Sequence, residues 1–278
     1  MRRPGWDARR RNRNIGTAKS GHGQNNQMQI AEGHKGGQYP FFYEDLENPV
    51  VLSRTIGDRE VTFLVEPVQP GFLHACTPDH IAQVLRLLPS NHTKCIDFVV
   101  LRQPKRKEYL LESVWGRMCY WVEIHQYSGV AIYLEAQPIN EIKRWRKSLL
   151  PDDVRELERL AQDGHQVIVE RRHYAVYTNL ESVRATQLYR TLPHEVGHYV
   201  DYLHFEEGGE EELFWSKPSK DKEAFAHRYA TEFWEREKAA GKIPFERTLN
   251  EEALTAEGLA PFWFTSPSTQ IQGIDFNL

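Results

Sequence analysis

Two histidines four residues apart in a helix-prone stretch constrain this chain more than any other feature of its sequence. They stand in His194-Glu195-Val196-Gly197-His198, within residues 180–202. Side chains at positions i and i+4 project from the same face of an α-helix, so both imidazoles can reach one ion. Glu195 lies beside the first histidine and can take a proton from water at such an ion. The pattern predicts two metal ligands and a catalytic base, as in a hydrolase that uses one Zn²⁺ ion.

Pro193 is the only obstacle to a helix over residues 180–202. Proline lacks a backbone N–H and is tolerated in a first helical turn, whereas it kinks a helix interior. Two arrangements follow from this property. Either Thr191 caps a new helix with Pro193 in its first turn, or one longer helix bends at Pro193.

A catalytic zinc site needs a third protein ligand, and His204 is the first candidate. His194, His198 and His204 have the ligand spacing of the metzincin peptidases. This resemblance is incomplete, because Asp201 stands where that family has the glycine that breaks the helix, and all three methionines precede the motif, so the family's methionine turn is absent. In an unbroken helix, His204 would lie about 15 Å along the axis from His194, too far for a shared ion.

Glu223 is the second candidate, on a predicted helix over residues 221–238. Here the chain resembles the gluzincin metallopeptidases, and most closely the small gluzincin domains that include the catalytic domain of anthrax lethal factor. Residues 194–201 match His-Glu-x-Gly-His-x-x-Asp, and residues 223–226 match Glu-x-Phe-Ala. The resemblance implies a peptidase with one Zn²⁺ ion held by His194, His198 and Glu223, and with Glu195 as the catalytic base. The matching order of segments extends over about residues 75–240, but the specific motifs occupy only about 45 residues.

Two positions depart from the gluzincin pattern. The residue four positions after the third ligand is usually acidic and orients a ligand histidine, whereas this chain has His227, and Asp201 is the alternative for that role. The family can also supply a tyrosine or histidine shortly before the third ligand to stabilise the oxyanion, but residues 205–222 contain neither. The available substitutes are His204, His227, Tyr229, Tyr174 and Tyr177.

Hydrophobic periodicity and turn residues predict an α+β fold, and the resemblance makes it zincin-like, with a mixed sheet, an active-site helix and a following Glu-bearing helix. Residues 50–56 and 60–66 form a predicted hairpin, and residues 96–101, 118–124 and 130–136 are further predicted strands. The predicted divisions are a disordered basic tail (1–40), a β-hairpin appendage (41–72), a metallopeptidase domain (73–265) and a flexible C-terminal tail (266–278).

Charge is distributed unevenly along the chain, whose formal net charge is −4. Residues 1–40 contain eight basic and two acidic residues, and hardly any aliphatic side chains. Such a segment is expected to be disordered, and it can bind nucleic acid or be a solvated tail without a partner. There is no run of eighteen apolar residues and no apolar signal region, so we expect a cytoplasmic protein without a membrane partner.

Three features bear on the substrate, which is predicted to be a peptide or protein. The resemblance makes residues 173–178 the edge strand that borders the cleft, to which an extended peptide can add, and the alternative is a structural strand with ordinary aromatic packing. The acidic run 206–212 favours basic substrates if it borders the cleft, and is otherwise a solvated loop. The aromatic cluster at residues 262–264 and the C-terminal residues 275–278 either fill the cleft as an inhibitory segment or dock elsewhere. Alternatives to a free peptidase are a catalytically quiet regulatory binding module and a peptidase tethered to nucleic acid.

Overall fold

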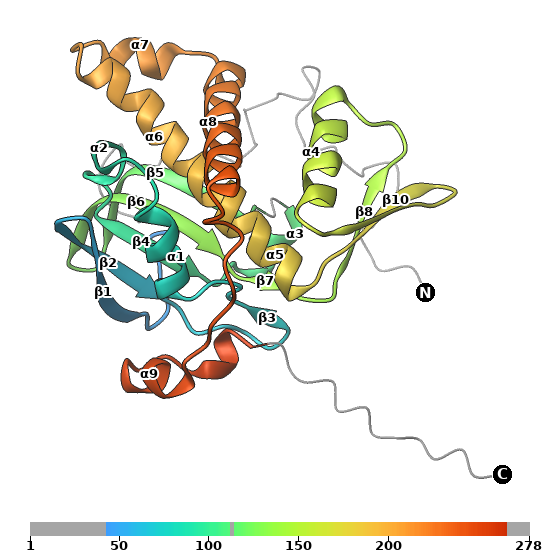
Figure 1. The fold of residues 1–278 in the computed structure, drawn as a ribbon, viewed down its shortest axis with the longest axis horizontal. Coiled ribbons are helices and arrows are strands. Elements are labelled where there is room, and N and C mark those ends of the chain that lie inside the picture. The colour runs from blue at the N-terminus through green and yellow to red at the C-terminus, as the bar shows by residue number, and fades with distance from the viewer. Residues whose placement is uncertain (1–42, 112–113, 266–278) are drawn as a thin grey trace, which may run out of the picture. The chain divides into compact units, whose positions relative to one another are not determined.

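The computed structural model describes residues 43–111 and 114–265. The segments 1–40 and 266–278, for which we predicted tails, therefore lie outside the described residues. The chain divides into two compact units, Met1–Asp45 and Leu46–Leu278. Only residues 43–45 of the first unit are described, and every helix and strand below belongs to the second (Figure 1).

A β-hairpin opens the second unit. Strands β1 (Val50–Ile56) and β2 (Arg59–Val65) pair antiparallel around a short turn, as their β-prone sequences predict. β2 then pairs in parallel with β4 (Phe98–Arg102). The hairpin is therefore part of the main sheet and not an appendage to it.

The main sheet is mixed and has five strands in the order β1-β2-β4-β6-β5. β4 pairs in parallel with β6 (Tyr127–Glu135), and β6 pairs antiparallel with β5 (Gly116–Ile124), which ends the sheet. All five residues of β4 are buried, which explains its unbroken run of apolar residues up to Arg102. The α+β class predicted from the sequence is confirmed.

The main core lies between this sheet and the helices. Helix α1 (Pro78–Leu85) begins where Thr77 caps the backbone N–H of His80, with Pro78 in the first turn. Its buried Ile81 lies in one apolar cluster with side chains of the sheet, such as Phe63 and Ile132, and with Val196 of the His194–His198 motif. The motif is thus anchored in the core.

The motif lies on one long helical stretch. Helix α5 (Leu180–Thr186) passes into the π-helical turn η3 (Gln187–Thr191) and then into α6 (Leu192–Glu206). Thr191 has helical backbone angles and no capping hydrogen bond, and the N–H of Leu192 bonds to the carbonyl of Gln187, five residues back. The helical stretch is therefore continuous, as in the second predicted arrangement, although Pro193 lies in the first turn of α6 as in the first. The wider turn accommodates the missing N–H of Pro193.

A smaller module follows the main sheet in the chain. Strands β8 (Ile142–Arg146) and β9 (Gln166–Val169) flank β10 (His173–Tyr177), and all pairs are antiparallel. Helix α4 (Pro151–Gln162) packs on this sheet through a small apolar cluster of Leu157, Leu160 and Val176. Because β10 is paired on both sides, the prediction that residues 173–178 form an open edge strand is wrong.

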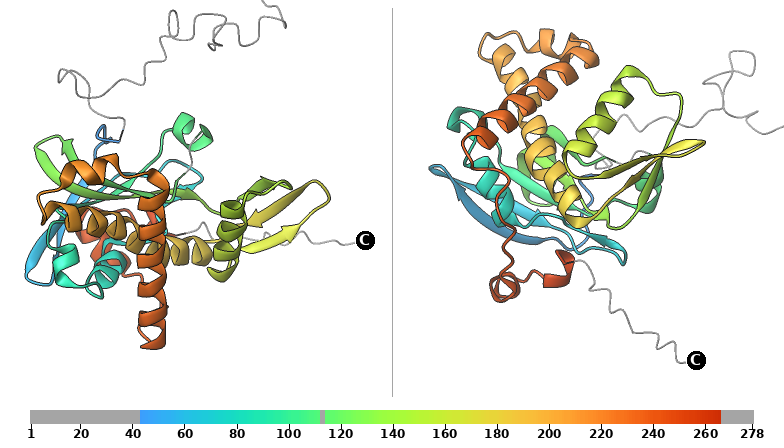
Figure 2. Two further views of the ribbon diagram at one scale, coloured as in Figure 1. Left: turned by 90° about the horizontal axis from the view of Figure 1, so that it is seen from above. Right: turned by 45° about the vertical axis from the view of Figure 1, so that its right-hand side comes forward.

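Two further helices follow α6. Helix α7 (Glu211–Ser216) leads into the long helix α8 (Ser219–Ala239), which crosses α6 (Figure 2). The remaining elements are short: β3 (Phe72–Leu73), β7 (Gln137–Pro138), α2 (Ser90–Thr93), α3 (Arg106–Leu111), α9 (Glu251–Ala256) and the 3-10 turn η4 (Pro261–Trp263). Within the described ranges, none of these helices is long and apolar enough to cross a bilayer. The cysteines are not paired with one another in disulfides, and Cys76 and Cys119 are buried.

Buried His74 makes stability dependent on pH. Its Nε2 bonds to the carbonyl of Glu66 at 2.8 Å, and burial lowers its pKa to about 4. Below pH about 6.5 this histidine is protonated in the unfolded chain, but in the folded chain it stays neutral until about pH 4. As the pH decreases across this window, the free energy of unfolding therefore decreases by up to about 3 kcal/mol.

We expect this dependence to weaken in His74→Gln, which keeps an N–H donor but does not titrate. The free energy of unfolding of both proteins is measured in urea from about pH 7.5 to about pH 4.5. As the pH decreases, wild type should lose more of this free energy than the variant. The nearby buried Glu66 carboxyl, whose pKa burial raises to about 7, is common to both proteins. A difference that does not change with pH would contradict the assignment.

Candidate metal centre

Three side chains from two helices converge on one point. His194 and His198 of α6 place their Nε2 atoms 3.1 Å apart, and Glu223 of α8 places its two oxygens 3.3 Å and 3.4 Å from them. They form a group whose ligand atoms all lie within 4.8 Å of one another. The structure thus brings together the three residues that the sequence resemblance proposed as ligands.

The spacing of these atoms suits a tetrahedral ion. With metal–ligand bonds of about 2.0–2.1 Å, two ligand atoms of a tetrahedral zinc site lie about 3.3–3.4 Å apart. The donor set of two imidazoles and one carboxylate is one that zinc accepts with a fourth position open. Two imidazole nitrogens and a carboxylate facing one another can therefore hold a single cation.

The close approach of α6 and α8 brings Glu223 to the histidines. A Cβ atom on Gly197 would lie 3.0 Å from Cβ of Tyr229 and 3.1 Å from Cα of Ala226. The glycine within the motif and the small Ala226 therefore let the two helix backbones pack directly against each other. A larger residue at either position would separate the ligands.

Glu195 differs from Glu223 in its environment, although both are glutamates. It is 7% exposed, and burial raises its pKa, opposed by the charges of His194 and His198 and by a hydrogen bond from the backbone N–H of Met118 in β5. A raised pKa lets a carboxylate accept and return a proton near neutral pH. The position and environment of Glu195 suit a general base.

Glu223 and His198 stabilise each other's charged forms. Hydrogen bonds with His194 and His198 hold the pKa of Glu223 well below its usual range. Burial opposes the charged form of His198, but the hydrogen bond with Glu223 and the charge of Glu195 raise its pKa overall. The arrangement is a pocket of negative potential that favours a bound cation.

The two positions predicted to orient the ligands have different surroundings. Both carboxylate oxygens of the buried Asp201 accept from Nζ of Lys217, at 2.7 Å and 2.6 Å. His227 instead lies against a ligand, with its ring centroid 4.5 Å from that of His194. The Nδ1 atom of His194 is buried and has no hydrogen-bond partner among the described residues. Of the two candidates, His227 therefore contacts the proposed metal ligand His194, whereas Asp201 pairs with Lys217.

A pocket of about 400 Å³ opens beside His194 and Glu195. We call it the proximal pocket. Its far walls are Trp115, which directly precedes β5, and Lys143 and Trp145 of β8. The module of α4 and β8 thus faces the motif across a cavity large enough for an amino-acid side chain.

Close backbone contacts place the start of β5 at this pocket. A Cβ atom on Gly116 would lie 2.6 Å from the carbonyl oxygen of Tyr133 and 2.8 Å from the Thr191 side chain, directly before α6. The amide of Gln187 in η3 donates to the carbonyl oxygens of Trp115 and Glu135. These contacts tie the edge strand to the motif helix.

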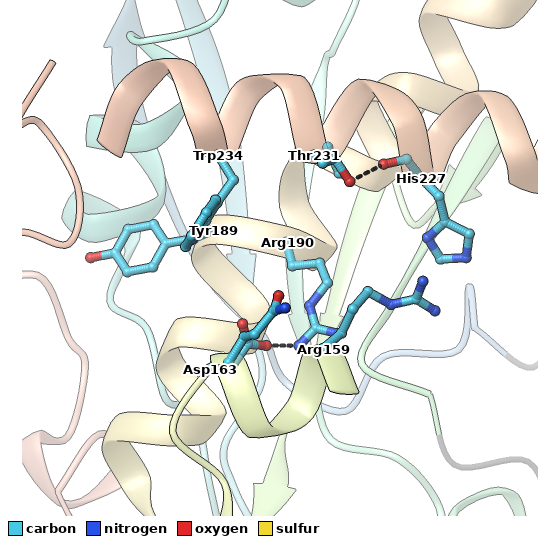
Figure 3. Close-up of a pocket in the computed structure, with 9 residues that line it drawn as sticks. Arg159, Asp163, Tyr189, Arg190, His227, Thr231 and Trp234 are labelled. Carbon is cyan, nitrogen blue, oxygen red and sulfur yellow. Dashed lines mark hydrogen bonds and ion pairs between the residues drawn. The ribbon is translucent and has the colours of Figure 1, made fainter. Parts of the chain in front are cut away.

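A second, smaller pocket of about 60 Å³ shares His227 with the proximal pocket (Figure 3). Arg159 of α4 points toward His227 there, and Arg190 forms an ion pair with Asp163. Burial, followed by the charges of His194 and Arg159, lowers the pKa of His227 to about 4. His227 is therefore neutral at neutral pH.

The structure separates His204 from the metal centre. Helix α6 runs unbroken from His194 past His204, so the two lie about 15 Å apart along the axis, and His204 is exposed. Of the five candidates for oxyanion stabilisation, only His227 lines the proximal pocket. Tyr229 instead bonds through its hydroxyl to His92 at 2.8 Å.

The acidic run 206–212 is exposed and extends from the last residue of α6 through the turn into the first residues of α7. It begins twelve residues after His194, about 18 Å along the helix axis. None of its glutamates lines the proximal pocket. Of the two predicted roles of this run, its position favours the solvated loop over the border of a substrate cleft.

Sequence reasoning missed the far wall of the proximal pocket. Strand β8 was not predicted, because its sequence Ile-Lys-Arg-Trp-Arg is mostly charged. Only the spacing of Lys143 and Trp145, which places both on one face of a strand, could have indicated a shared surface.

The comparisons with known proteins add no family to this geometry: no family model, curated protein or solved structure that was searched matches the chain.

We expect Gly197→Val to push α6 and α8 apart and to weaken metal binding. Overpacking of a close contact typically costs about 1–3 kcal/mol, so urea unfolding should show a loss of this size. Zinc titration should show a weaker affinity in the same variant. Gly208→Val is the matched control, because a Cβ atom there meets nothing closer than 3.6 Å. Wild-type zinc affinity in Gly197→Val would contradict the role of this contact.

Proposed function

We propose that the chain is a zinc metallopeptidase of gluzincin type with a zincin-like fold. The observation that carries this proposal is the convergence of His194, His198 and Glu223 with Glu195 beside them. The mixed sheet, the motif helix and the crossing Glu-bearing helix support it, since they occur in the order that the resemblance implies. The substrate is a peptide or protein, and the cofactor is one Zn²⁺ ion.

In this proposal the chain's own residues handle the proton. When bound, the zinc ion supplies Lewis acidity, which lowers the pKa of water and polarises a peptide carbonyl. Glu195 accepts the proton from the attacking water and returns it to the leaving amine. His227 is the neutral group best placed to donate a hydrogen bond to the developing oxyanion, since it lines the pocket with Glu195.

The edge strand β5 supports a peptide as the substrate. It pairs with β6 on one side only, and its Met118 N–H bonds to Glu195. An extended peptide can add to the other side of such a strand by backbone hydrogen bonds. We therefore propose β5 as the strand to which a peptide adds, in place of residues 173–178.

Metal analysis tests the ligand set. The wild-type chain should bind one zinc ion, and His194→Ala and Glu223→Ala should each lose it, because two ligands hold zinc far less tightly than three. His204→Ala is the control and should keep the metal. Loss of zinc in His204→Ala but not in Glu223→Ala would refute the assignment of the third ligand.

Glu195→Gln separates binding from catalysis. The amide cannot accept a proton, so we expect peptide cleavage to fall by about 10²–10⁴-fold while zinc content stays the same. A randomised peptide pool read by mass spectrometry measures cleavage without knowledge of the substrate. Undiminished cleavage by the variant would mean that Glu195 is not the base.

A further inference from the structure

Lys143 is an unusual residue in the wall of the proximal pocket. Its Nζ lies 4.3 Å from the ring centroid of Trp115 and 3.4 Å from Oε1 of Gln137. Among the described residues, no carboxylate lies within ion-pair distance of this amine. Burial lowers the pKa of Lys143, opposed by the charge of Glu141. A partly desolvated cation without an anionic partner is costly for the folded chain.

The arginines around this pocket already have carboxylate partners. Arg190 forms ion pairs with Asp163 and, at 3.6 Å, with Glu156. Glu156 also pairs with Arg159 at 2.7 Å. Apart from the candidate metal centre and Glu195, Lys143 therefore contributes one positive charge to the pocket that no ion pair among the described residues neutralises.

The rest of the pocket is suited to the stem of a side chain. The rings of Trp115 and Trp145 and the aliphatic Leu160 form apolar walls, and the volume is about 400 Å³. His194 and Glu195 line the same cavity. A group bound at Lys143 would thus belong to the same ligand that reaches the metal centre.

We propose that the proximal pocket binds a carboxylate of the peptide substrate next to the scissile bond, and that Lys143 is the residue that recognises it. This inference rests on the proposed peptidase function and names its substrate class. The carboxylate is either the side chain of an internal Asp or Glu or the C-terminus of the peptide. Both present the same charged acceptor to the amine.

Peptide retention by the full-length, zinc-loaded Glu195→Gln variant tests the inference. Three randomised pools are compared: blocked peptides with Glu at one fixed position, blocked peptides with Gln there, and the Gln pool with a free C-terminal carboxylate. Retained peptides are counted by mass spectrometry. We expect at least one carboxylate pool to be enriched about tenfold or more over the blocked Gln pool, the range of a charge-assisted hydrogen bond. The pool that is enriched identifies the source of the carboxylate.

Substitutions of Lys143 assign the enrichment to its amine. Lys143→Gln should abolish the enrichment, and Lys143→Arg should retain most of it, which also shows that the pocket is folded. Lys147→Gln is the matched control, since Lys147 also lies over an aromatic ring, that of Tyr174 at 4.8 Å, but does not line the pocket. Equal retention of all pools, no retention of any, or an unchanged preference in Lys143→Gln would overturn the inference.

The readout keeps this inference separate from the proposed function. Retention by Glu195→Gln does not require the catalytic base, whereas the proposed function requires zinc binding and cleavage by the wild-type chain. Cleavage without a preference for carboxylates would therefore reject only the role of Lys143. A preference that depends on Lys143 without zinc or cleavage would reject only the peptidase.

Discussion

The packing of α6 against α8 at Gly197 is the contact on which the candidate metal centre depends. Two histidines on one helix can bind an ion only weakly, and the third ligand comes from another helix. Because Gly197 has no side chain, Ala226 of that helix packs directly against α6, and Glu223 faces both imidazoles. The glycine inside the motif has a structural role, whereas the residues on either side of it in sequence carry the chemistry or the core.

The surroundings of Glu195 and Glu223 give two identical side chains opposite protonation behaviour. Burial makes the first a stronger base than a free glutamate, and hydrogen bonds from two histidines keep the second ionised. Divergent pKa values of neighbouring carboxyl groups are a general sign of divided roles. Here the difference follows from the burial of Glu195 and from the two histidines that contact Glu223, and it matches the proposed roles of base and metal ligand.

Local patterns in the sequence predicted the elements that carry these residues. The helix predicted over residues 221–238 matches α8 to within a few residues, because helical periodicity is a local property. The three candidate metal ligands followed from spacing and from a family resemblance, and the structure brings them together. The two errors were non-local. The strand at residues 173–178 is not an edge, because β8 pairs with it. Strand β8 was not predicted, because its sequence is mostly charged. Whether the hairpin stands apart depends on its pairing with β4, which is distant in the chain.

The π-helical turn η3 sets the angular phase between the two halves of the long helix. A π-turn holds one residue more than the α-helical turn it replaces, and one residue corresponds to about 100° of rotation. Val183 before it and Val196 after it both reach the main core, although His194 faces the metal centre. Without that extra residue, one half of the helix would be rotated by about 100° relative to the other. Val183 would then not face the core while His194 faces the candidate metal centre. The π-helical turn therefore rotates the second half of the helix so that the same helix contributes both to the core and to the candidate site.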